Sequence, residues 1–132
     1  MRAKLPLIGS VVLLAGMLLA AIPMAAHHSF AAEYDSAATV TLKGVVTKVE
    51  WTNPHAYIYL DVKDEAGNVV NWGMEGYPPN TLTRTGFTRH IVKEGDTIVI
   101  TGFRARDSAA RAAAREITLS DGKKIYFGPA AQ

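Results

Sequence analysis

The chain has 132 residues, contains no cysteine, and carries equal numbers of basic and acidic residues beyond its first 26 positions. This length limits it to one domain, and the lack of thiols excludes disulfides, thiolate metal sites, thiol nucleophiles and a lipidated cysteine. Residues 1–26 hold two of the 14 basic residues and no acidic one, which leaves 12 basic and 12 acidic residues in the rest. A nucleic-acid partner is not expected, because phosphate binding needs a concentrated basic patch.

Residues 1–26 predict a secretory signal peptide. Arg2 and Lys4 form a basic start, the run Leu5–Ile22 is almost wholly apolar, and Pro23 ends it before small residues. An uncleaved membrane anchor is the alternative, since the run is nearly long enough to span a bilayer. Small residues interrupt the run, and no basic stop-transfer cluster follows it. We therefore expect a cleaved signal, a periplasmic or secreted protein, and no stable membrane insertion after cleavage.

Beyond the signal, we expect a flexible arm at residues 27–38, a β-domain at residues 39–128 and a frayed tail at residues 129–132. Alternating apolar residues and turn signals predict strands at 39–51, 55–63, 69–75, 97–103, 116–119 and 124–127. A short helix is expected at 80–85, ending at Gly86. Residues 104–115 have high helix propensity, but they also fit a loop that rises into a strand.

Five or six short strands with one helix between the third and fourth predict an all-β fold, a small OB-like Greek-key barrel. Gly44 supports closure, because a glycine inside a strand often marks the bulge or bend that a small barrel needs. The alternative is a small β-sandwich.

A set of motifs spans nearly the whole mature chain. They are the start His27–Phe30, the Gly44–Val46 strand, the Trp51–His55 turn, Trp72, Gly86, the Gly95–Asp96 turn and Asp121–Gly122. This combination resembles an uncharacterised family of small exported bacterial proteins that is catalogued only as a domain of unknown function. Phe87 and His90 are less typical of it. The resemblance implies export and an all-β fold, and it implies no activity.

Three of the four histidines, His27, His28 and His55, predict a transition-metal site of the copper type. Imidazole nitrogen suits copper, zinc and nickel, and an amino-terminal histidine also chelates through its amine. The alternative is a solvated His–His pair on the arm, with His55 hydrogen-bonded at its turn.

The position of signal cleavage decides which nitrogens are available. Cleavage after Ala26 makes His27 the amino terminus, and cleavage after Ala25 leaves a terminus suited to square-planar copper or nickel. Cleavage after Ala31 fits the small-residue preference better, and it discards both histidines of the arm.

A second candidate site is an aromatic surface for a small organic ligand or an oligosaccharide. OB barrels stack sugars or bases on such faces. The candidate residues are Trp51, Asn53, Tyr57, Tyr59, Trp72 and Glu75. The alternative for Trp72 is a place in the core.

These patterns favour an exported binding or accessory protein. The alternative is a scaffold or assembly partner of a periplasmic enzyme complex, which docks through the aromatic face and the Tyr77–Pro79 loop. A metal-dependent enzyme is a third hypothesis, but no carboxylate or serine lies in a recognised nucleophile or paired-carboxylate motif. We therefore assign no catalytic residue. Glu50 and Glu75 are candidates for orienting His55, and His90 is expected on the surface.

Overall fold

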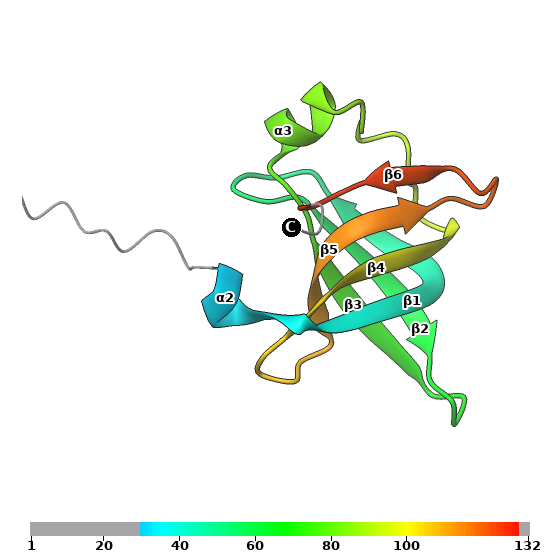
Figure 1. Ribbon diagram of the computed structural model, residues 1–132. Coiled ribbons are helices and arrows are strands. Elements are labelled where there is room, and N and C mark those ends of the chain that lie inside the picture. Colours follow the sequence, from blue (N-terminus) through cyan, green and yellow to red (C-terminus); the bar gives the residue numbers. More distant parts are fainter. Residues whose placement is uncertain (1–29, 130–132) are drawn as a thin grey trace, which may run out of the picture.

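The chain forms a closed barrel in its computed structural model, which describes residues 30–129 (Figure 1). The strands are β1 (Tyr34–Glu50), β2 (Tyr57–Lys63), β3 (Val69–Glu75), β4 (Thr97–Ala105), β5 (Arg111–Thr118) and β6 (Lys124–Tyr126). Helix α2 (Phe30–Glu33) precedes β1, and α3 (Pro79–Arg84) joins β3 to β4. Figure 1 shows α3 at one end of the barrel and the β2–β3 hairpin at the other.

The strand order identifies the barrel as OB-like. Neighbours run β3-β2-β1-β4-β5, and a short parallel pairing of β3 with β5 closes the ring. All other pairs are antiparallel, and β6 continues the sheet beyond β5. The expected all-β Greek-key barrel is confirmed. A sandwich does not form, because one sheet closes on itself instead of facing a second sheet.

The core is built from the inward-facing residues of each strand, as the alternation predicts. Ile58 and Leu60 of β2, Met74 of β3 and Ile100 of β4 are fully buried. Side chains from outside the strands join the same core, among them Ala56, Leu82, Phe87, Val92 and Phe127. The aliphatic and aromatic core replaces the disulfides that the chain lacks.

Strand β1 bends at Gly44, where it passes from pairing with β4 to pairing with β2. A Cβ atom at Gly44 would lie 2.5 Å from the Asp61 carbonyl oxygen, so only glycine permits this approach. A bulge follows between Val46 and Lys48. The bend predicted from Gly44 is present, and it lets one long strand serve both halves of the barrel.

Residues 104–115 form a loop and a strand, and the helix considered as an alternative does not form. Strand β4 extends to Ala105, and β5 begins at Arg111. Ala112 and Ala114 are fully buried, and β5 passes between β4 and β3. Small side chains are needed where strands approach closely, so tertiary packing overrides the helix propensity of alanine. Helix α3 ends as predicted, with Gly86 at a φ of +87°.

The barrel starts earlier than the sequence patterns indicate, because α2 and the first part of β1 occupy residues 30–38. Phe30 packs edge-on against Phe103, with ring centroids 5.6 Å apart. Arg106 Nε donates to the Ala31 carbonyl at 2.8 Å. The signal peptide expected at residues 1–26 lies outside the described residues. Between residues 30 and 129, no helix has the length and apolar character needed to cross a membrane.

Candidate functional site

The β1–β2 connection, Trp51–Ala56, is fastened to the segment that follows β3. The buried Ala56 donates its N–H to the Tyr77 carbonyl at 3.2 Å and accepts from the Gly76 N–H at 2.8 Å. At the other end of the connection, the Trp51 ring stacks on Phe87 with centroids 6.2 Å apart. Both ends are therefore held against the barrel, and His55 is presented between them.

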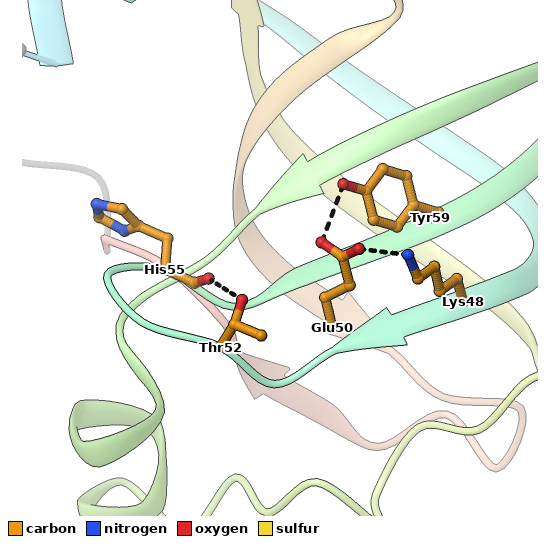
Figure 2. A network of polar contacts seen from close by, with 5 residues as sticks. All are labelled: Lys48, Glu50, Thr52, His55 and Tyr59. Carbon is orange, nitrogen blue, oxygen red and sulfur yellow. Dashed lines mark hydrogen bonds and ion pairs between the residues drawn. The ribbon is translucent and has the colours of Figure 1, made fainter.

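His55 is oriented by two acceptors on the same ring nitrogen. Its Nδ1 lies 3.0 Å from the Gly76 carbonyl oxygen and 3.5 Å from Glu75 Oε1. A carbonyl oxygen only accepts hydrogen bonds, so Nδ1 carries the proton and Nε2 of the neutral ring keeps its lone pair. The side chain is 42% exposed. Figure 2 shows the ring pointing away from the polar group on β1 and β2.

Glu75 is the centre of a second set of contacts. The Tyr34 hydroxyl donates to Glu75 Oε2, so the start of β1 meets the end of β3. The guanidinium of Arg111 lies over the Tyr34 ring, 5.7 Å from its centroid, and Arg111 Nη2 also bonds Asp107 Oδ2 at 3.2 Å. The Glu75 side chain is only 15% exposed. The carboxylate thus connects the Tyr34 hydroxyl to the imidazole of His55.

Burial and the Glu75 carboxylate raise the pKa of Tyr34 and of Tyr57 above the ordinary tyrosine value of 10.0. Because the folded state holds the Tyr34 proton more tightly than the unfolded state, its contribution to stability is complete below pH 10 and declines above it. We expect urea unfolding free energies to fall above pH 10, and to fall less steeply in Tyr34→Phe. Tyr126→Phe, at an exposed tyrosine, is the matched control and should follow the parent. A parallel decline in all three proteins would contradict the assignment.

Glu50 belongs to a different group from His55. It bonds the Lys48 ammonium, and its Oε2 accepts from the Tyr59 hydroxyl at 3.2 Å (Figure 2). Hydrogen bonding by Lys48 lowers the pKa of Glu50. Of the two carboxylates considered for His55, Glu75 lies beside its ring, and Glu50 is engaged by Lys48 and Tyr59.

The aromatic candidates do not form one surface. Tyr57 and Tyr59 stack with centroids 6.1 Å apart on the outer side of β2. Trp72 is 8% exposed and belongs to the core, which was the alternative to a ligand-binding role. Trp51 packs on Phe87. Asn53 is exposed in the β1–β2 connection. The tyrosine pair is the part of the predicted surface that faces outward.

The Tyr77–Pro79 loop is bound to the barrel. Tyr77 N–H donates to the Phe127 carbonyl at 2.9 Å, Pro79 is buried, and Tyr77 packs against the core. The loop therefore exposes less surface for docking a partner protein than the sequence analysis expected. His90, in contrast, is exposed as expected.

Residues 30–129 alone do not complete a metal site: no three His, Asp or Glu side chains among them are grouped to hold an ion. His27 and His28 lie outside the described residues. The sequence patterns did not predict Tyr34 as a neighbour of Glu75 or Arg111 as a neighbour of Tyr34, because strands far apart in sequence bring them together. A tyrosine at the start of a strand is only a weak indication of a site residue. The register of strand pairing is needed to show which side chains it contacts.

The fold and this loop define a small OB-like barrel with a histidine and a carboxylate side by side at the β1–β2 connection. The chain belongs to the family of unknown function DUF6152, which it matches over residues 15–114. The predicted resemblance to a domain of unknown function is thereby confirmed, although the match ends before Asp121–Gly122. No curated protein and no solved structure matches the chain.

Proposed function

We propose that this protein is an exported binding protein that holds a transition-metal ion of the copper type through His55, His27 and His28. The observation that carries the proposal is the orientation of His55. Metal-bound histidines usually donate their second ring N–H to a carbonyl or carboxylate. Nδ1 of His55 has both acceptors next to it, Gly76 O and Glu75 Oε1, and the lone pair of Nε2 is left for a metal.

The reach of the chain supports participation of the arm. Phe30 packs on Tyr34 with ring centroids 5.5 Å apart, Tyr34 bonds Glu75, and Glu75 lies 3.5 Å from His55. The first described residue is therefore connected to His55 by three successive side-chain contacts. His28 and His27 precede Phe30 by two and three residues. Three residues of chain span at most about 11 Å, so the anchoring of Phe30 leaves both histidines within reach of this part of the barrel.

The same anchoring favours signal cleavage after Ala25 or Ala26 over cleavage after Ala31. Cleavage after Ala31 would remove the Phe30 ring from Phe103 and the Ala31 carbonyl from Arg106. Both contacts belong to the folded body. Of the three cleavage positions considered, the two that keep these contacts also keep His27 and His28.

Imidazole and amine nitrogens, without thiolates, favour copper(II), nickel or zinc over iron–sulfur or calcium chemistry. The compartment and the metal are part of the proposal, and the basic and apolar start of the sequence supports export.

A native mass spectrum of protein exported by a bacterial host and purified without chelator tests the proposal directly. It reports the mature amino terminus and bound metal together. We expect a chain starting at Ala26 or His27 with one metal ion. A chain that starts at Ala32, or a metal-free chain that takes up no added copper(II), would contradict it.

A second candidate function is supported by the outward tyrosine pair. Tyr57 and Tyr59 present parallel rings beside the Lys48 and Glu50 side chains, on the face that OB barrels commonly use for ligands. This surface suits a sugar ring or a partner protein, as an accessory or assembly role requires. Tyr59→Ala should abolish such binding and leave metal uptake unchanged, whereas His55→Ala should do the reverse.

A further inference from the structure

We infer that Arg115 is the anchor of a binding site for a small organic acid, on the outer surface of β1, β4 and β5. The site shares no residue with the His55 group and does not depend on the proposed metal function.

A bulge brings Arg115 to this surface. Thr101 pairs with Glu116 and Gly102 pairs with Ala114, so Arg115 is the extra residue of β5. A bulge re-aims the side chain of the additional residue and is often found next to a functional site. The Arg115 carbonyl accepts from the N–H groups of Phe127 and Gly128, at 2.8 and 3.2 Å, which fixes the bulge from its other side.

The guanidinium of Arg115 packs against an aromatic ring of β4. Its Cζ is 5.2 Å from the centroid of the Phe103 ring, in a cation–π contact. Its Nε is buried and has no hydrogen-bond partner among the described residues, the only buried side-chain nitrogen or oxygen there of which this holds. An unpaired buried donor costs stability. Because Nε is covered by the protein and the terminal nitrogens are not among the buried unpaired atoms, a ligand in the neighbouring depression would meet the terminal nitrogens of the guanidinium.

Arg115 borders a depression of about 320 Å³, near the lower end of volumes for small-molecule sites. The rest of its lining includes three hydroxyl-bearing residues and consists of Thr39, Val40, Thr41, Thr101, Gly102 and Glu116. The Glu116 carboxylate is paired with Lys124 Nζ at 3.0 Å, so it does not cancel the charge of Arg115. The depression thus combines one guanidinium with several hydroxyls.

These groups match a small carboxylic acid. A guanidinium presents its N–H donors in a planar fork that fits the two oxygens of a carboxylate. The threonine hydroxyls can donate to or accept from the remaining polar groups of such a molecule. The depression of about 320 Å³ has room for a short di- or hydroxy-acid.

The test is an NMR titration of the full mature protein with succinate at constant ionic strength, following the amides of Thr101 and Gly102 and the Nε–H of Arg115. We expect shifts that saturate. Arg115→Gln should bind roughly tenfold or more weakly, because a charge-assisted hydrogen bond is lost. Arg115→Lys should also weaken binding, since an ammonium cannot form the two parallel bonds.

Arg104→Gln is the matched control, because Arg104 lies over an aromatic ring, Trp72, in the same way but borders no part of the depression. It should bind succinate as the parent does. Equal binding by the parent and Arg115→Gln, linear shifts without saturation, or equal shifts with uncharged succinamide would each overturn the inference. Saturation by phosphate but not by succinate would overturn the assignment to organic acids.

Discussion

Replacing His55 by alanine is expected to lower copper(II) affinity by about 100-fold or more, since even residues that only orient a ligand typically contribute 10- to 100-fold. The expected loss comes from removing Nε2, the nitrogen left free when Nδ1 donates to Gly76 O. The measurement is a competition titration against a chromophoric chelator. Parent and variant must have the same verified amino terminus, because the terminal amine is itself a proposed ligand.

His90→Ala is the matched control, because His90 is an exposed histidine in the connection between α3 and β4. Its affinity should equal that of the parent. Glu75→Gln tests orientation separately and should weaken binding by about tenfold, because the amide is a poorer acceptor beside Nδ1. If His55→Ala binds copper(II) as the parent does while His28→Ala does not, the arm binds the ion alone and the role of His55 is refuted.

Phe127→Ala is expected to lower the free energy of unfolding by about 3–5 kcal/mol, the range for a fully buried aromatic residue. Its ring is completely buried and lies 5.1 Å from that of Phe87. Its backbone joins two parts of the barrel, since it donates to Arg115 O at 2.8 Å and accepts from Tyr77 N at 2.9 Å. The cavity would therefore open where the carboxyl-terminal segment closes the barrel.

Urea unfolding followed by tryptophan fluorescence measures this effect. Tyr126→Ala is the control on the neighbouring residue, which is 54% exposed. We expect it to change stability by roughly 0.5 kcal/mol or less. Similar losses in both variants would show that the segment is held by its backbone bonds rather than by the Phe127 ring.

Local sequence patterns were sufficient to predict most strands of the barrel and the residues that face its core. The period-2 runs in β2 and β3 place Ile58, Leu60 and Met74 inside, as observed. A core position for Trp72 was the alternative to ligand binding. It follows from the same alternation, because Trp72 and Met74 share a face of β3. The helix between β3 and β4 was also predictable, since Gly86 provides the positive φ that ends it.

The candidate site was predicted in part. His55 and Glu75 were singled out from their positions at strand ends, and their contact follows from the pairing of Tyr57 with Glu75. Tyr34 was not predicted to join them, because no local pattern reports where the start of β1 meets β3. The position of Arg115 was equally inaccessible, since a bulge depends on the register between two strands.

The amino-acid sequence alone determined the family, the all-β class, the closure through a bent first strand and the core face of most strands. These properties depend on short-range periodicity and on glycines at special backbone positions. Both can be recognised within a short stretch of sequence. Three features became known only from the folded structure: the alanine-rich segment after β4 is a strand, Glu75 rather than Glu50 lies beside His55, and Arg115 lies on Phe103. Each of these depends on contacts between residues distant in sequence, where packing against neighbours outweighs intrinsic preference.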